Sequence, residues 1–294
     1  MPKVSVIIPT YNSGAFLDEA IKSIQSQTFR DLEILIVNDG STDSSSETIN
    51  ALASEDPRIR VINKQNSGIV DSINIGIEKT DSEYICRMDA DDISLQQRIE
   101  LQIQAMSEKR NTVVCGSNII KFGAYSQRTY YPLSNSACKT TLLINNCFAH
   151  PATMIRRSAL DGIGNPYKQE YLYAEDYKLW SEISSKGDFL NIPTPLLRYR
   201  IHPGQTGSKR RELQRAAHAK VAKENLVLIG IDWLTTNQIR TIIWPDEAEN
   251  KIYGSKIIIQ AYSALLRAGA NPFHLSVLLA KQAIKSAFKR QSYV

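Results

Sequence analysis

The sequence predicts an α/β protein in which a mainly parallel sheet is flanked by helices, with a C-terminal helical appendage. Short apolar runs rich in β-branched residues alternate four times with segments whose apolar residues recur at helical spacing. The 294 residues, 43% hydrophobic and 22% charged, have the balance of an ordinary globular protein. We expect one domain over residues 1–207 and a basic helical region over residues 208–294.

Four strand–helix pairs fill the first third of the chain. The strands are expected at residues 4–9, 32–37, 58–62 and 84–88. The helices are expected at residues 15–27, in the segment carrying Ile49 and Leu52, in the segment carrying Ile69, Ile73 and Ile77, and at residues 95–107. Because each parallel strand is reached through a crossover helix, this alternation predicts a sheet covered on both faces.

The middle of the chain is less regular. Strands are expected at residues 112–116, 118–122, 128–131, 150–157, 189–192 and 196–199, and a helix at residues 138–145. Another helix is expected to end before Gly187, with Glu175 and Asp176 in its first turn, where the helix dipole favours carboxylates. The inward-facing residues of this helix would be Leu179, Trp180 and Ile183.

The tail is predicted to be helical and basic. The expected helices are at residues 215–228, 234–243, 248–268 and 272–289. Residues 207–294 hold 14 Lys and Arg against 6 Asp and Glu, whereas residues 1–206 hold 21 against 24. The last helix pairs an apolar stripe with a stripe of lysines. It could pack on the domain, form a dimer surface, or lie on an anionic membrane surface, and the sequence leaves all three open.

Three carboxylates in four positions, Asp89, Asp91 and Asp92, follow the fourth strand. If the strand geometry continued, Asp89 and Asp91 would point the same way, and they would repel each other unless a cation lay between them. Hard oxygen ligands of this kind suit Mn²⁺ or Mg²⁺ shared with substrate phosphates. The alternative is that Asp91 or Asp92 caps a helix that begins near Ser94.

Polar clusters also end two other strands, at Thr10-Tyr11-Asn12 and Asp39-Gly40-Ser41. Ligands of open α/β sheets bind outside the carboxyl ends of the strands, so we expect these clusters and the acidic run to meet in one site. The sequence has no G-x-G-x-x-G after its first strand and no G-x-x-x-x-G-K-[ST] motif. This argues against a nicotinamide or flavin site and against a P-loop kinase or ATPase.

The cellular setting is inferred from what the sequence lacks. No stretch is apolar for the roughly 18 residues of a membrane span, and the run at residues 4–8 is too short for a signal peptide. The four cysteines have no C-x-x-C spacing, which predicts reduced thiols and no zinc site. We expect a cytoplasmic protein, peripheral on the inner face of the membrane if the last helix binds lipid. No nucleic-acid partner is expected, because the basic tail lacks interleaved aromatic residues.

Residues 3–207 resemble the inverting family 2 glycosyltransferases of bacterial surface-polysaccharide assembly, which have the Rossmann-like GT-A fold. The motifs that carry the resemblance are Val4–Asn12, Val37–Asp43, Asn66-Ser67-Gly68, Asn74-Ile75-Gly76, Met88–Asp92, His150-Pro151, Glu175-Asp176 with Trp180, and Arg198–Pro203. They occur in the family's order. The helical tail after Ser208 is not covered by them.

The resemblance implies roles at the nucleotide end of the site. Thr10, Tyr11 and Asp39 would hold the base and ribose, with Asp39 accepting a hydrogen bond from a uracil N–H. Asp89 would contact the ribose or the metal. Asp39 has a structural alternative, because an Asp before Gly40 is also ordinary turn chemistry.

The resemblance also implies a metal and a base. Asp91 would bind the Mn²⁺ or Mg²⁺ that bridges the diphosphate, and His202 would complete the metal or diphosphate site unless it is a solvated loop residue. Asp176 would be the catalytic base, with Glu175 positioning the acceptor or the sugar. The alternative for Asp176 is a partner of the helix dipole.

Three further side chains are candidate acceptor or sugar contacts. His150 could equally be a buried, hydrogen-bonded histidine. Trp180 fits the core better than an acceptor platform. Arg87 lies between core residues and would have to reach a phosphate.

Together these features predict a metal-dependent inverting transfer of sugar from a nucleoside-diphosphate sugar, with a UDP-sugar expected, to a hydroxyl of a saccharide or lipid-linked saccharide. One base and one in-line displacement would give a β-linkage from an α-linked donor. A sugar-nucleotide nucleotidyltransferase is the alternative enzyme, disfavoured because no Gly- and Arg/Lys-rich triphosphate loop follows the first strand. A non-catalytic binding relative is disfavoured by the presence of both Asp91 and Asp176.

Overall fold

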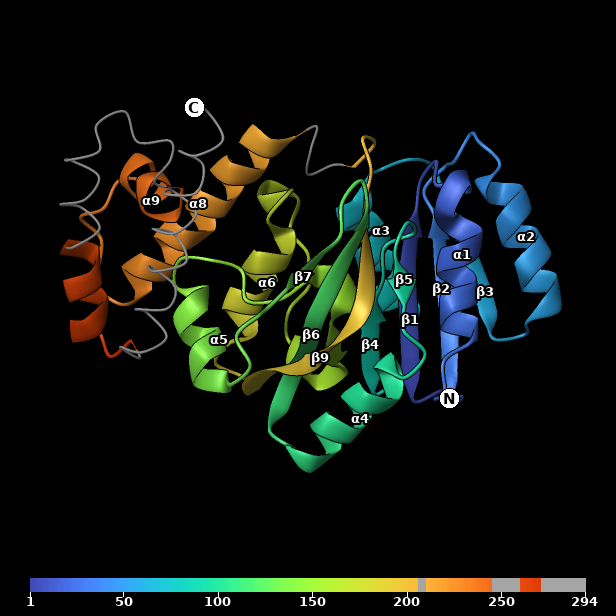
Figure 1. The fold of residues 1–294 in the computed structure, drawn as a ribbon, viewed down its shortest axis with the longest axis horizontal. Coiled ribbons are helices and arrows are strands. Elements are labelled where there is room, and N and C mark those ends of the chain that lie inside the picture. Colours follow the sequence, from blue (N-terminus) through green and yellow to red (C-terminus); the bar gives the residue numbers. More distant parts are fainter. Residues whose placement is uncertain (206–209, 245–259, 271–294) are drawn as a thin grey trace.

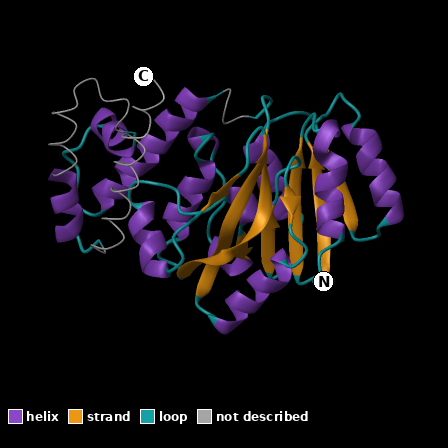
Figure 2. Cartoon of the chain, in the orientation of Figure 1, coloured by secondary structure: helices purple, strands orange, loops and turns teal. Residues whose placement is uncertain are grey.

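The computed structural model describes residues 1–205, 210–244 and 260–270. A nine-stranded, mainly parallel sheet runs through the middle of this part of the molecule (Figures 1 and 2). The strands follow one another across the sheet in the order β3 (Ile59–Asn63), β2 (Leu32–Asn38), β1 (Val4–Thr10), β4 (Tyr84–Arg87), β8 (Met154–Arg156), β6 (Thr112–Gly123), β9 (Asp188–Ile201) and β5 (Ile93–Ser94), with β7 (Gln127–Thr129) paired to β6. The predicted α/β class is confirmed.

The alternation of side chains along β1 explains how the sheet is covered on both faces. Val6 and Ile8 point to one face and Ile7 to the other, and all three are fully buried. The first face packs on α1 (Gly14–Gln25), α2 (Ser45–Glu55) and α4 (Arg98–Glu108). The second face packs on α3 (Ile69–Glu78), α5 (Asn135–Leu142) and α6 (Glu175–Ile183). Burial on both faces is why these strands are almost continuously apolar in sequence.

Three expectations about the middle of the chain were wrong. The two strand pairs predicted at residues 112–122 and 189–199 are two long strands, β6 and β9, which pair in parallel with register shifts around Ser117 and Asn118. Gly116 reads as a strand break in sequence, but it lies within β6, where a Cβ would come within 2.2 Å of Asn191 Oδ1. The strand predicted at residues 150–157 is a short 3₁₀ turn, His150–Ala152, followed by β8.

The described part of the tail packs on the α/β domain. Helices α8 (Arg211–Leu228) and α9 (Thr236–Ile243) belong to the same hydrophobic cluster as α3 and α6. Asn225 of α8 donates hydrogen bonds to the Leu142 carbonyl at 2.7 Å and to Ser181 Oγ at 3.0 Å. Residues 260–267 are helical, whereas the helix predicted at residues 272–289 lies outside the described residues. The domain boundary near residue 207 stays a prediction.

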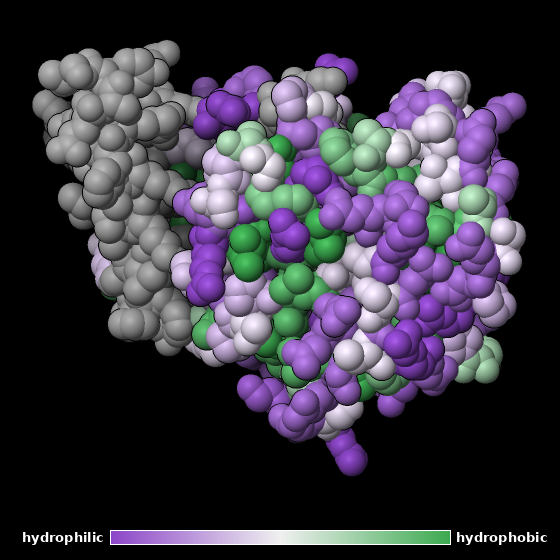
Figure 3. Space-filling view, turned by 45° about the vertical axis from the view of Figure 1, so that its right-hand side comes forward, coloured by the Kyte–Doolittle hydropathy of each residue, from purple (hydrophilic) through white to green (hydrophobic). Residues whose placement is uncertain are grey.

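The surface of the described chain is unevenly apolar. The right of Figure 3, over the N-terminal half, is mostly hydrophilic, and apolar residues gather near the middle of the view. The exposed large apolar side chains are Met1, Tyr11, Tyr125, Tyr130, Leu133, Leu213, Val227, Leu228 and Trp233. None of the helices in the described ranges has the length and hydropathy to cross a bilayer.

Candidate active site

A pocket of about 690 Å³ opens at the carboxyl ends of β1, β2 and β4. The predicted meeting of the three strand ends is confirmed, because six of the predicted site residues line this one pocket. They are Thr10, Tyr11, Asp39, Asp89, Asp91 and His202. The pocket is also lined by Leu172 and Tyr173. Only Ala174 separates Tyr173 from the Glu175-Asp176 pair in the sequence.

Thr10 and Tyr11 line the pocket at the end of β1, which we call the first end of the pocket, and they differ in what they can offer a ligand. The Thr10 side chain is buried, and its carbonyl accepts a hydrogen bond from the Asp39 amide at 2.8 Å. The Tyr11 side chain is exposed, so its ring is free to lie against a ligand. Of these two residues, Tyr11 is the one with an accessible side chain.

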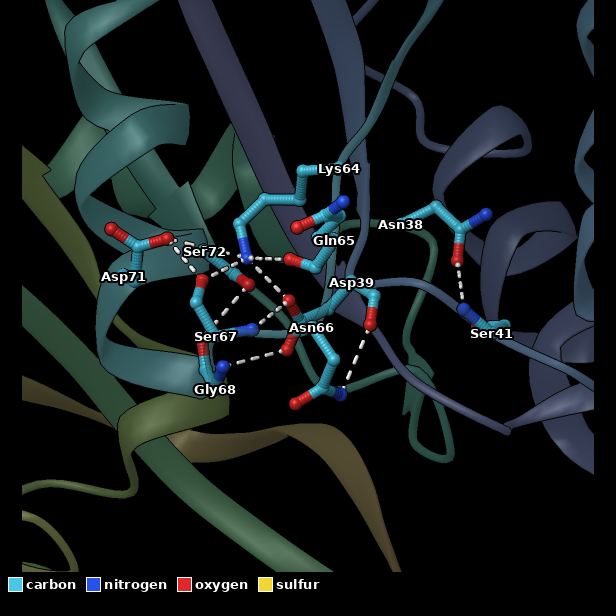
Figure 4. A network of polar contacts seen from close by, with 10 residues as sticks. All are labelled: Asn38, Asp39, Ser41, Lys64, Gln65, Asn66, Ser67, Gly68, Asp71 and Ser72. Atoms are coloured by element: carbon cyan, nitrogen blue, oxygen red, sulfur yellow. Dashed lines mark hydrogen bonds and ion pairs between the residues drawn. The ribbon is translucent and has the colours of Figure 1, made fainter.

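Asp39 holds the loop that begins α3 (Figure 4). Its two carboxylate oxygens accept hydrogen bonds from the amides of Ser67 and Gly68, each at 2.9 Å. The next residue, Gly40, has a φ of 71°, and a Cβ there would come within 3.0 Å of the Asn66 amide nitrogen. Asp39 therefore has a structural role in this loop and also lines the pocket.

The acidic run forms a compact cluster, but its carboxylates are brought together by a turn and not by the alternation of side chains along a strand. Strand β4 ends at Arg87, and Asp89, Asp91 and Asp92 lie on the turn after it, with oxygens within 4.8 Å of one another. The capping alternative is wrong, because α4 begins only at Arg98. His202 Nε2 lies 2.9 Å from Asp91 Oδ2, bringing together residues that are 111 positions apart.

The electrostatics of this cluster favour a cation. Burial and the neighbouring Asp89 carboxylate raise the pKa of Asp91, although the hydrogen bond with His202 lowers it. Burial, Asp89 and Asp91 raise the pKa of Asp92 still further. The three carboxylates supply hard oxygen donors of the kind that Mn²⁺ and Mg²⁺ prefer, so the residues fit the predicted metal.

Asp92 was not singled out from the sequence as a site residue. One of its oxygens accepts a hydrogen bond from the Arg200 amide at 2.8 Å, and the other is buried without a hydrogen-bond partner among the described residues. It ties the acidic turn to the end of β9, two residues before His202. Its place within the acidic run was the only sequence signal for it.

Arg87 and His150 are buried and do not line the pocket. Arg87 is buried and forms an ion pair with Asp89. Burial opposes its charge, but Asp89 raises its pKa on balance. His150 Nε2 lies 2.8 Å from the Tyr167 hydroxyl, and burial with the nearby Arg87 charge lowers its pKa well below the usual value. The buried-histidine alternative describes His150 as it stands here.

Glu175 and Asp176 begin α6, as predicted, but they do not line the pocket themselves. Asp176 is half-buried and accepts a hydrogen bond from Asn146 Nδ2 at 2.6 Å, and burial raises its pKa. The chain reaches them through Tyr173, whose φ of 76° is rare for a residue with a Cβ. No sequence pattern pointed to Tyr173, which holds the pocket wall next to this acidic pair.

Glu175 provides a testable pH dependence. Burial and the adjacent Asp176 raise its pKa to about 7. The pKa of Glu175 is higher in the folded than in the unfolded protein. Its contribution to the free energy of unfolding is therefore fully present below about pH 4.5 and is lost as the pH rises through about 7. We expect the free energy of unfolding to fall over this window by on the order of 2 kcal/mol more in wild type than in Glu175→Gln. Urea titrations at several pH values measure it.

The control for that experiment is Glu170→Gln, since Glu170 is exposed and five residues away in sequence. Its pH dependence should follow wild type. Parallel curves for wild type and Glu175→Gln would show that Glu175 ionises in the folded protein as it does in the unfolded chain.

Trp180 lies in the core and not at the pocket, so its structural alternative describes it. The side chain has no exposed surface, and its ring packs against Phe148 and His150 at centroid distances of 5.4 Å and 6.1 Å. We expect Trp180→Ala to destabilise the protein by about 3–5 kcal/mol in urea unfolding. Half-exposed Trp233 is the control, and its replacement by Ala should cost less than about 1 kcal/mol. Equal losses would contradict the packing described.

Similarity to known proteins agrees with this geometry. The family described as Glycosyl transferase family 2 matches residues 5–164. An uncharacterized glycosyltransferase of Haemophilus influenzae is 34% identical over 289 residues, which cover 90% of this chain and 87% of that protein. A hyaluronan synthase of Pasteurella multocida is 28% identical over 258 residues, covering 86% of this chain but only 26% of the synthase.

The fold is shared with a solved glycosyltransferase structure. Residues 1–349 of TarS from S. aureus, crystallised in complex with UDP-GlcNAc, superpose with a TM-score of 0.67 at 18% identity, covering 99% of this chain and 91% of that one. This likeness concerns the GT-A fold. With the family match over residues 5–164, it leads to one conclusion: the chain belongs to glycosyl transferase family 2 and is a glycosyltransferase.

Proposed function

We propose that the protein transfers a sugar from a UDP-sugar to a hydroxyl group of a saccharide or lipid-linked saccharide, with inversion, in a reaction that depends on a divalent metal ion. One observation carries the proposal. A single pocket is lined by Asp39, by Asp89 and Asp91 of the acidic cluster, and by Tyr173, so a nucleotide, a cation and a sugar could be held side by side.

The nucleotide would lie at the first end of this pocket. Asp39 would accept a hydrogen bond from a base N–H, and the exposed Tyr11 ring would cover the base or ribose. The diphosphate would then reach Asp89, Asp91 and His202. A divalent cation bound there would act as a Lewis acid that neutralises charge on the departing diphosphate.

The acceptor hydroxyl would be deprotonated by Asp176. The raised pKa of this carboxyl makes it a stronger base than an exposed aspartate, and Asn146 fixes its orientation. Glu175 and the pocket wall at Tyr173 would position the sugar. A single base acting opposite the leaving group gives inversion, and so a β-linkage from an α-linked donor.

The relatives support the substrate classes. TarS was crystallised with UDP-GlcNAc, which favours a UDP-sugar donor. A relative named hyaluronan synthase favours a saccharide product and thus a role in polysaccharide biosynthesis. We propose a cytoplasmic site of action, with peripheral attachment to the membrane if the acceptor is lipid-linked.

Thermal unfolding with UDP, GDP and dTDP, each with and without Mn²⁺, tests the donor class. A ligand that binds only the folded state raises the midpoint by mass action. We expect the largest shift with UDP, and only when Mn²⁺ is present. Metal-dependent release of UDP from UDP-sugars then separates an enzyme from a binding protein. No shift with any nucleotide would overturn the proposal.

A further inference from the structure

Lys64 has no place in the proposed reaction, yet its ammonium group joins several members of a polar network that includes Asp39 (Figure 4). It follows β3 directly, its side chain is only 12% exposed, and it does not line the pocket. Its ammonium group contacts Asp39, Ser67, the Gln65 carbonyl at 3.1 Å and Asp71 at 3.2 Å. A flexible lysine held by this many partners is fixed in position.

The network determines what remains free on Asp39. A carboxylate has about four lone-pair directions. Oδ1 accepts from the Ser67 amide and from Lys64, and Oδ2 accepts from the Gly68 amide. One direction remains, on Oδ2. Because Asp39 itself lines the pocket, this single acceptor is what the carboxylate presents to a ligand.

Charge explains why the lysine is needed. The Asp39 side chain is 5% exposed, and Asp71 shares the same lysine. Without Lys64, a buried carboxylate would lose its counter-charge and Oδ1 would lose an acceptor contact. The Ser67 and Gly68 amides would still hold the two oxygens, but the remaining acceptor on Asp39 would be less firmly fixed in direction.

We propose that Lys64 is a positioning residue for nucleobase selection: through Asp39 it fixes one hydrogen-bond acceptor in the pocket, so that bases with a ring N–H are bound and cytosine is rejected. This rests on the proposed function. Uracil carries N3–H, which donates to Asp39, whereas cytosine N3 is itself an acceptor and would face the carboxylate oxygen. UDP and CDP share the ribose and diphosphate, so their difference isolates this contact from the metal site.

Isothermal titration of UDP and CDP with Mg²⁺ present tests the proposal in wild type, Lys64→Met, Lys64→Arg and Lys79→Met. Wild type should prefer UDP by about 10- to 100-fold, the worth of a hydrogen bond to a charged group. Lys64→Met should lose most of this preference by weakening UDP while leaving CDP nearly unchanged. Lys64→Arg retains the charge and should restore much of it. Lys79 is exposed, and within the described ranges its ammonium group pairs with the neighbouring Glu78, so Lys79→Met should behave like wild type.

The two possible failures are distinguishable. Wild-type protein that binds neither nucleotide would overturn the proposed function and this inference with it. Wild type that binds UDP and CDP equally would overturn the inference alone. So would a Lys64→Met protein in which both nucleotides weaken in parallel, because a merely structural lysine would affect them alike.

Discussion

Replacing Asp176 by Asn is expected to lower the turnover of sugar transfer by about 10²- to 10⁴-fold, the usual contribution of a general base. Asn keeps the size of the side chain and an oxygen that can accept the hydrogen bond from Asn146, so the start of α6 should keep its geometry. What is lost is the ability to take a proton from the acceptor. Initial rates at saturating donor would measure the effect.

Two controls make this result specific. Glu182→Gln changes a carboxylate on the same helix, paired with Lys168 and Lys178, and should stay within about 3-fold of wild type. UDP binding by Asp176→Asn should match wild type, since Asp176 does not line the pocket. Transfer by Asp176→Asn within a few-fold of wild type would mean that another group takes the proton.

The first half of the fold could be predicted because its signals are local. Strands such as β1 and β2 are buried on both faces, so each appears as an uninterrupted apolar run, and each following helix has its own apolar stripe. The predicted ends of these elements lie within a few residues of those observed. The direction of the strands then places their carboxyl ends, and with them the candidate site, at one edge.

The second half could not be predicted in the same way, because long-range pairing decides it. Strands β6 and β9 continue through residues that resemble breaks, among them Gly116 and Pro193, because each is supported by the other over its length. Strand β5 has only two residues and exists through its pairing with β9. No window of sequence contains that information.

The candidate site was likewise predictable only in part. Its residue types were visible at the strand ends, but their partners were not. The Arg87–Asp89 ion pair, the Asp92–Arg200 contact and the Lys64 network each join groups whose relation depends on the folded chain. The unusual backbone at Tyr173 is likewise imposed by surroundings that an unremarkable sequence does not reveal.

Asp91→Asn is expected to separate stability from ligand binding. In the metal-free protein, burial and the Asp89 charge raise the pKa of Asp91, which means that the folded state disfavours its ionised form. Removing the charge relieves this repulsion, so the unfolding midpoint of the ligand-free variant should equal or exceed that of wild type. An Asn oxygen can still accept a hydrogen bond from His202.

The same substitution should remove most of the Mn²⁺-dependent nucleotide binding and should lower the rate of sugar transfer. Wild type with Mn²⁺ and UDP at about 100 times the dissociation constant should gain about 2.7 kcal/mol of stability, and Asp91→Asn should gain little of the part that requires Mn²⁺. Transfer should fall by about 10²- to 10³-fold, the cost of losing one group that stabilises transition-state charge. Thermal unfolding and initial rates on the same samples measure both effects.

Asp81→Asn is the matched control, because Asp81 is exposed and precedes β4, whereas Asp91 follows it. It should change neither the midpoint of the free protein nor the response to Mn²⁺. Asp91→Asn is expected to keep or raise the stability of the free protein and to lose the stability gained from Mn²⁺ with UDP. This combination distinguishes a ligand site from a structural carboxylate, since loss of a structural group lowers stability with and without ligand alike. An Asp91→Asn protein that is destabilised when free, yet keeps the full Mn²⁺-dependent gain with UDP, would place the metal elsewhere and leave the acidic turn a purely structural role.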